Sequence, residues 1–131
     1  MSFMQRLAGA PISWGVCEVP GWGIELSPDR VLSEMQQVGL SATELGSDGY
    51  LPTDPQYDLT MIGGFVPVVI HEQTEEQATI DATHRAAKLM SAAGGTLFVS
   101  SPVTDWNWGP RRDLDSQDWL QSAKMLSVID D

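Results

Sequence analysis

The chain has little of what several classes of protein require. Its single cysteine, Cys17, cannot form an internal disulfide, and its amino-terminal residues lack the apolar run of a signal peptide, so we expect a cytoplasmic protein. The apolar runs, such as FVPVVI at 65–70, are far shorter than the roughly 20 residues that a membrane-spanning helix needs. Basic residues are also scarce, because 7 lysines and arginines face 18 acidic residues and the net charge is −11. Such a surface repels phosphate backbones and anionic lipids, so neither nucleic acid nor a membrane is expected as a partner.

Glycine-rich phosphate loops are missing as well. The glycines in GWG at 21–23 and in GG at 94–95 lack the spacing and the strand-to-helix setting of a nucleotide-binding loop. Cys17 has no histidine, asparagine or second cysteine at a spacing that indicates a nucleophile or a metal pair. We therefore expect no nucleotide, and we interpret Cys17 as a small buried side chain.

What is present favours a folded domain with alternating strands and helices. A chain of 131 residues is expected to form a single domain, and 42% hydrophobic residues with five tryptophans can supply a core. Four short apolar segments with turn-forming neighbours predict strands. These are Pro11–Val16, Thr43–Gly46, Phe65–His71 and Thr96–Ser101. The third is almost continuously apolar, as strands are when a parallel sheet buries both of their faces.

Three further segments predict helices. The first begins with Ser27 as its amino-terminal cap and Pro28 at its first position, and Gly39 ends it. The second is predicted to begin with a capping box formed by Thr74 and Gln77, and its apolar residues, mostly alanines, recur on one face. The last is expected to begin at Asp115 or Ser116 and to carry these apolar residues: Trp119, Leu120, Ala123 and Leu126.

The order of these elements predicts a fold class. Strands that alternate with helices form parallel sheets with right-handed crossovers and with helices on the outer face. A complete (β/α)8 barrel takes about 250 residues. We therefore expect an α/β fold that is a partial TIM barrel, a half barrel of four parallel strands with outer helices, over residues 1–131.

Three motifs, in this order, carry a resemblance to a known family. They are APISWG at 10–15, ATELGSDGYLPTDP at 42–55 and GGFVPVVIH at 63–71. Together they resemble the first half of the xylose-isomerase-like (β/α)8 barrels, most closely the branch of inosose (2-keto-myo-inositol) dehydratases and sugar phosphate isomerases/epimerases. The resemblance covers nearly the whole chain, and it implies a metal-dependent lyase or isomerase that acts on keto-sugars or inososes.

The chain departs from this family in two ways. Members of the branch normally place an α-helix before the third strand, but only Gln56–Met61 separate Pro55 from IGGFVPVVIH, so most of that helix is expected to be missing. The family holds a divalent metal, such as manganese or cobalt, with a Glu, Asp, His and Glu set in the second half of the barrel, beyond this chain. The resemblance therefore implies no metal ligand and no cofactor in this chain, and no activity by the chain alone.

Position selects the candidate site residues, because barrel enzymes work at the carboxyl ends of their strands. Glu44 and His71 end two expected strands, and a carboxylate with an imidazole can move a proton alpha to a ketone. We expect both residues to be catalytic and to bind substrate. Trp14, Tyr50 and Ser100 are expected to bind substrate as well, since aromatic faces stack on sugar rings and hydroxyl groups bind sugar hydroxyls.

Other roles stay open for several of these residues. Glu44 could form a structural ion pair, because burying an acidic side chain without a partner is costly. His71 could be an ordinary polar residue at a strand end, and His84 is interpreted as a solvated helix residue. Trp106 and Trp108, in the loop TDWNWGP at 104–110, could form a lid over a ligand, but we favour packing against the protein or a second subunit.

Two functional hypotheses remain. In the first, the chain supplies half of the pocket of a keto-sugar or cyclitol enzyme. In the second, it is a non-catalytic half barrel that binds a small polyol or serves as an assembly module. The open edges and the uncovered inner face of a half barrel predict a homodimer under either hypothesis, with Trp14, Phe65 and Phe98 as candidate contacts.

Overall fold

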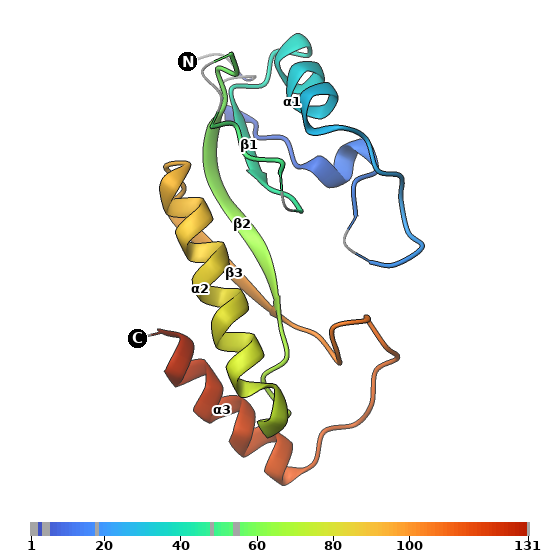
Figure 1. Ribbon diagram of the computed structural model, residues 1–131, viewed down its shortest axis with the longest axis vertical. Helices are drawn as coiled ribbons and strands as arrows, with labels where there is room; N and C mark the ends of the chain where they lie inside the picture. Colours follow the sequence, from blue (N-terminus) through green and yellow to red (C-terminus); the bar gives the residue numbers. More distant parts are fainter. Residues whose placement is uncertain (1–2, 4–5, 18, 48, 54–55, 131) are drawn as a thin grey trace. The chain divides into compact units, whose positions relative to one another are not determined.

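The computed structural model describes residues 3, 6–17, 19–47, 49–53 and 56–130. The chain is an α/β protein, as expected, and its strands and helices alternate except that β1 leads directly to β2 (Figure 1). Its helices are α1 (Pro28–Gln37), α2 (Glu76–Ala92) and α3 (Ser116–Asp130), and its strands are β1 (Ala42–Leu45), β2 (Thr60–Val68) and β3 (Leu97–Pro102). Two 3-10 helices, η2 (Pro11–Trp14) and η3 (Gln73–Glu75), precede α1 and α2.

The three strands form one sheet in the order β1-β2-β3. β1 and β2 are parallel, with Thr43 opposite Met61 and Glu44 opposite Gly63. Ile62 is therefore an extra residue in β2, and this irregularity has the form of a β-bulge. Figure 1 shows β3 running in the same direction as β2, so the expected parallel sheet is confirmed with three strands.

The expected first strand at Pro11–Val16 is wrong, and with it the count of four strands. The described residues there form the 3-10 helix η2, which ends at Gly15 with a φ of 85°. Pro11 has no N–H to donate to a strand ladder, and glycine adopts a positive φ at little cost. A short bridge just before this segment takes the place of a strand: the Gly9 N–H donates to Ala42 O over 2.8 Å, and Gly9 O accepts from Glu44 N over 2.8 Å.

The structure divides into two compact units, which we describe separately. The first contains residues 1–65 and 88–99. Its hydrophobic cluster joins Val31, Leu32 and Met35 of α1 to three buried residues outside the helix: Val16, Tyr50 and Leu59. The predicted start of α1 is confirmed, because the Ser27 Oγ accepts from Arg30 N over 3.4 Å and Pro28 is the first helical residue.

The connection between β1 and β2 is as short as the sequence predicted. Of residues 46–59, the described ones contain no helix, while Asp48, Asp54 and Pro55 lie outside the description. Two tyrosines fasten this connection to the start of α1. The Tyr50 hydroxyl donates to the Leu26 carbonyl, and the Tyr57 hydroxyl donates to Asp29 Oδ1 over 2.6 Å. Hydrogen bonds to the start of α1 therefore fix the connection at the place where members of the resembling family have a helix.

The second unit contains residues 66–87 and 100–131. Its core is formed by Val68, Ile70 and Met125, against which Ile80 and Ile129 pack. The face of α2 that is buried in this unit is partly polar, because the buried residues Thr79 and Thr83 lie on it beside the apolar Ala86. The hydroxyl of Thr79 donates to Val69 O over 2.8 Å, which links α2 to the residues that follow β2.

The expected capping box at Thr74 and Gln77 is wrong. The chain enters α2 through the 3-10 helix Gln73–Glu75, whose cap residue, Glu72, makes no side-chain capping bond. The Gln77 side chain instead donates to Asp81 Oδ1 over 2.8 Å, one helical turn ahead. A 3-10 turn satisfies part of the free helix-start amides by itself, so the box is not needed.

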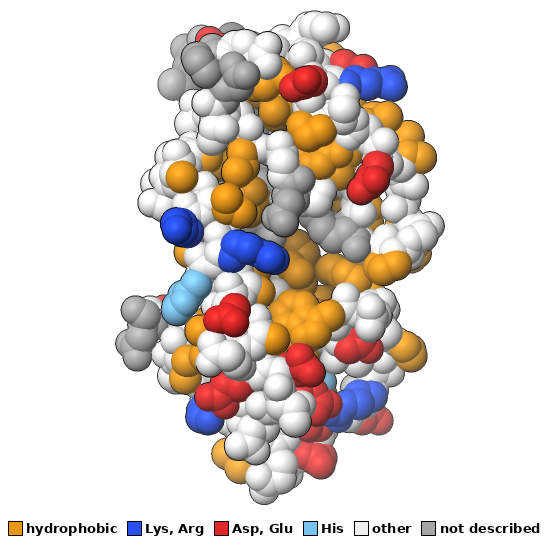
Figure 2. Space-filling model, in the orientation of Figure 1, with side chains coloured by type: hydrophobic (Ala, Val, Ile, Leu, Met, Phe, Trp, Pro, Cys, Tyr) orange, Lys and Arg blue, Asp and Glu red, His pale blue; other side chains and the backbone are white. Residues whose placement is uncertain are grey.

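Large apolar side chains remain exposed in both units. In the first unit, Leu97 and Val99 of β3 are 59% and 48% exposed, and in the second unit Trp119 and Leu120 of α3 are 63% and 64% exposed. Figure 2 shows apolar side chains at the surface beside acidic ones. Among the described residues no helix is long and apolar enough to cross a membrane.

Replacing Thr79 by valine tests the link between α2 and the end of β2. Valine keeps the shape of the buried side chain but removes the donor to the Val69 carbonyl, so we expect the free energy of unfolding to fall by about 1–3 kcal/mol. The matched control is Thr83→Val, because the Thr83 hydroxyl donates to the helical carbonyl of Thr79 and should cost less. Urea denaturation followed by circular dichroism measures both, and equal losses would contradict this account.

Candidate functional site

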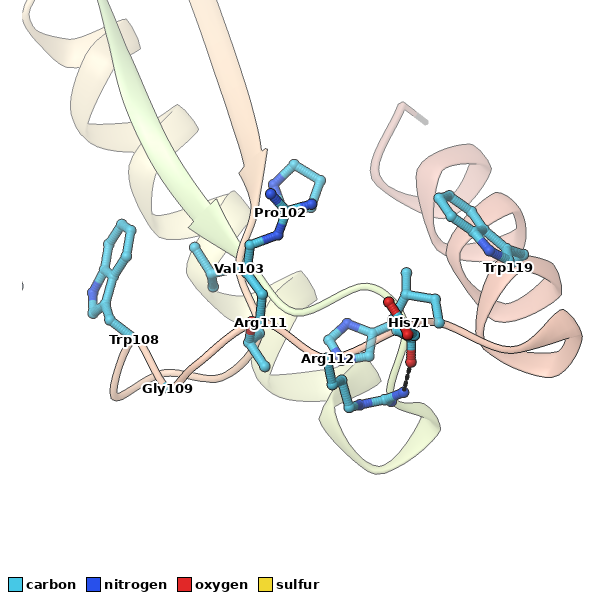
Figure 3. A pocket seen from close by; sticks show the side chains of 11 residues that line it. His71, Pro102, Val103, Trp108, Gly109, Arg111, Arg112 and Trp119 are labelled. Carbon is cyan, nitrogen blue, oxygen red and sulfur yellow. Dashed lines mark hydrogen bonds between the residues drawn. The ribbon is translucent and has the colours of Figure 1, made fainter.

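A cavity of about 590 Å³ lies within the second unit, where β2 and β3 end. His71 enters it from the segment after β2, Pro102 and Val103 from the end of β3, and Trp119 from α3 (Figure 3). The other lining residues come from the long loop between β3 and α3: Thr104, Trp108, Gly109, Arg111, Arg112, Asp113 and Leu114. Its place at the carboxyl ends of parallel strands is where enzymes of this architecture bind their ligands.

His71 is the most deeply buried polar residue of the cavity, with 6% of its surface exposed. Its Nε2 atom is buried and has no hydrogen-bond partner in the described part of the chain. The Glu72 Oε1 lies 3.6 Å from Nε2, which is too long for a hydrogen bond. A buried nitrogen without a partner is costly, so this atom is available to a polar group of a ligand.

Arg112 organises one wall of the cavity. Its guanidinium binds Asp118 with both terminal nitrogens, over 2.6 and 3.1 Å, and it binds Glu72 Oε1 over 2.9 Å. The hydrogen bonds from Arg112, followed by the backbone N–H of Asp115, lower the pKa of Asp118 to about 2. Conversely, hydrogen bonds to Asp118 and then to Glu72 raise the pKa of Arg112. The positive charge of Arg112 is therefore neutralised by carboxylates of the protein itself.

The loop between β3 and α3 is held in shape by Asp105. Its Oδ1 accepts hydrogen bonds from the backbone N–H groups of Asn107, over 2.7 Å, and Gly109, over 3.1 Å. Between them, Trp108 adopts a φ of 57°, a left-handed conformation that is uncommon for a bulky residue. Such conformations persist where surrounding contacts impose them, and they cluster at functional sites.

The two tryptophans of this loop have different surroundings. Trp106 is exposed, and its Nε1 donates to Glu75 Oε2 of η3 over 2.7 Å. The packing interpretation of the two tryptophans stays a prediction. Trp108 lines the cavity. In the view of Figure 3, Trp108 and Trp119 lie on opposite sides of the Arg111 side chain.

The structure places three of the predicted site residues in the first unit. Glu44 lies on β1 and is exposed, whereas its neighbour Thr43 is fully buried, so the premise that Glu44 is buried is wrong. Trp14 is half-buried, and its Nε1 donates to Glu34 Oε2 over 2.8 Å. Tyr50 is buried in the same hydrophobic cluster that Trp14 packs against, with its hydroxyl bound to Leu26 O. Their roles toward a substrate stay predictions.

His71 and Ser100 belong to the second unit, where His71 lines the cavity and Ser100 is half-buried on β3. Sequence reasoning missed Arg111, Arg112 and Trp119 as cavity residues. The sequence did contain a signal for the two arginines. They are adjacent in a long loop, which is where binding residues are common, and they come shortly before an acidic helix start.

No group of three or more metal-ligating side chains occurs among the described residues. His71 and Glu72 alone do not make up the four-residue set that the family resemblance implies. The described part of the chain therefore does not fit a resident divalent metal, and we derive no chemical step through one.

Asp118→Asn should make stability less sensitive to acid. Folding lowers the pKa of Asp118 from 3.8 to about 2, so between these pH values the unfolded chain binds more protons. This stabilisation is present above about pH 4 and is lost as the pH falls toward 2. We expect the urea midpoint to fall more steeply over this interval in the original chain than in the variant. Asp130→Asn changes an exposed carboxylate and should keep the original slope, and three equal slopes would refute the assignment.

Comparison with known proteins gives one informative similarity. The chain is 28% identical over 116 residues to inosose dehydratase from Geobacillus kaustophilus (strain HTA426), and the match covers 82% of this chain. It spans 37% of the length of that dehydratase. No family model matches the chain, and no solved structure matches it. The α/β architecture with a parallel sheet is compatible with part of a TIM-like fold, and the chain is similar to part of an inosose dehydratase.

Proposed function

We propose that the chain forms part of a lyase or isomerase that acts on keto-sugars or inososes. The observation that carries the proposal is the buried Nε2 of His71, which has no hydrogen-bond partner in the part of the chain that the structure describes and lies in a cavity at the carboxyl ends of β2 and β3. The similarity to an inosose dehydratase supports the substrate class. A coarser statement, that the chain is related to sugar-modifying enzymes, depends on that similarity alone.

The chemistry of such a reaction assigns roles to the candidate residues. Dehydration or isomerisation of a ketose requires removal of a proton alpha to the carbonyl, and imidazole exchanges protons in the neutral pH range. In the proposal, His71 takes or returns that proton through Nε2. Ser100, in the same unit, binds the polyol. The expected roles of Glu44, Trp14 and Tyr50, which belong to the first unit, stay predictions.

Binding of 2-keto-myo-inositol tests this proposal directly. We expect the 131-residue chain to bind it, and His71→Gln to weaken binding about tenfold because the cavity loses its free imidazole nitrogen. His84→Gln is the matched control, since His84 is an exposed residue of α2 and should bind like the original chain. Isothermal titration measures the affinities, and circular dichroism checks that both variants fold.

The same samples test activity. We expect no turnover of 2-keto-myo-inositol by these 131 residues with added manganese or cobalt, because the described residues hold no metal-binding set. Turnover would refute that expectation, and equal binding by His71→Gln and His84→Gln would refute the role of His71.

A second candidate function, an assembly module, is favoured by the exposed apolar surface of β3. Leu97 and Val99 alternate with half-buried Phe98, so they share one face of the strand, and both are about half exposed. Contiguous apolar surface of this kind favours association, and a twofold homodimer is the commonest way to cover it. We propose that a second copy covers this face.

Val99→Asp should dissociate such a dimer, because it places a charge in the apolar contact. We expect light scattering to report a dimer for the original chain at micromolar concentration and a monomer for the variant. Ser91→Asp is the control, since it adds the same charge at an exposed position of α2. A monomeric original chain, or a dimer that survives Val99→Asp, would contradict this assignment of the contact face.

A further inference from the structure

We infer that the cavity of the second unit binds a polyol that carries a carboxylate, and that Arg111 recognises this group. The inference rests on the proposed function for the polyol character of the ligand. The carboxylate is argued from the cavity itself, where the guanidinium of Arg111 has no partner among the described residues.

Arg111 is a cation of the cavity that has no partner among the described residues. It lines the cavity and is exposed, and no hydrogen bond or ion pair joins its side chain to a described residue. In Figure 3 its side chain extends from the loop toward Pro102. Arg112, by contrast, is bound by the two carboxylates of Glu72 and Asp118. A guanidinium presents a planar fork of donors that matches a carboxylate with two parallel hydrogen bonds.

The remaining lining groups fit the hydroxyls and the apolar face of a sugar. The carboxylate of Asp113 has no partner among the described residues and can accept from hydroxyl groups. The His71 Nε2 is available at the buried end of the set. Trp119, 63% exposed, offers an aromatic face of the kind on which sugar rings stack. The ligand therefore has hydroxyls on one side and one anionic group on the other.

The backbone around the cavity disfavours a phosphate. Phosphate sites gather several N–H groups from a loop or a helix start, and the ion carries close to two negative charges. Here the N–H groups of Asn107 and Gly109 are already bound by Asp105, and those of Gln117 and Asp118 at the start of α3 are bound by Asp115. Among the described lining residues one guanidinium, that of Arg111, remains free, while the carboxylate of Asp113 adds a negative charge. A singly charged carboxylate is therefore repelled less than a phosphate with close to two negative charges.

A matched pair of probes tests the inference. D-glucuronate and D-glucose differ only in a carboxylate against a hydroxymethyl group, so their affinities for the full chain isolate the anionic contact. We expect glucuronate to bind about tenfold more tightly than glucose, since a hydrogen-bonded charge pair has about this effect. Nitrogen–proton NMR titration of the full chain gives the affinities, with the Trp108 and Trp119 indoles as local reporters.

Two variants with the same change of charge assign the contact. Arg111→Gln should abolish the preference for glucuronate, and Arg85→Gln, an exposed residue of α2 outside the cavity, should retain it. Both changes are at exposed positions, so neither threatens folding. A preference that survives Arg111→Gln, or one that Arg85→Gln also removes, would overturn the assignment of Arg111.

The remaining outcomes separate this inference from the proposed function. Glucose 6-phosphate binding more tightly than glucuronate would overturn the carboxylate in favour of a phosphate, and acetate binding as well as glucuronate would overturn the polyol. If 2-keto-myo-inositol binds while glucuronate shows no preference, the inference fails and the proposed function stands. If glucuronate binds through Arg111 while 2-keto-myo-inositol does not bind, the proposed function fails and the recognition of a carboxylate stands.

Discussion

The cavity of the second unit depends on the bidentate ion pair between Arg112 and Asp118. Exposed ion pairs contribute little stability singly, but a guanidinium that binds a carboxylate with two nitrogens also fixes their geometry. Here the same guanidinium binds Glu72, so the first turn of α3 is tied to the residues that follow β2. Because Glu72 is directed to Arg112, its carboxylate stays 3.6 Å from the His71 Nε2. The Nε2 of His71 and the guanidinium of Arg111 have no partner among the described residues, so both can bind a ligand in the cavity.

Local rules predicted the elements whose signals lie within a few residues. Ser27 with Pro28 marked the start of α1, and the apolar runs around Val66 and Phe98 marked the existence of β2 and β3. The bounds of β2 were wrong, since it spans Thr60–Val68 rather than the expected Phe65–His71. The Pro11–Val16 segment failed because a proline without an N–H and a glycine with a positive φ outweighed its apolar character.

The site was less predictable, because it depends on which residues the fold brings together. In β1 the alternation of strand side chains buries Thr43 and exposes Glu44, and a four-residue strand gives too little pattern to decide between the two faces. The partners of Arg112 lie far from it in the sequence or across a loop, and no spacing rule links them. His71 was found because it follows a strongly apolar strand, which is a local signal.

The cavity combines a buried polar atom without a hydrogen bond and a strained backbone conformation, and both are unfavourable for folding. The Nε2 of His71 is buried without a partner among the described residues, and Trp108 has a left-handed φ of 57° in the loop that lines the same cavity. Each of these features opposes folding, and each is paid for by contacts elsewhere, such as the bonds of Asp105 and the core around Met125. A purely structural unit has no need of either, since a neighbouring donor or a glycine would relieve them. Their coincidence at the carboxyl ends of parallel strands is the physical reason to regard this cavity as a binding site.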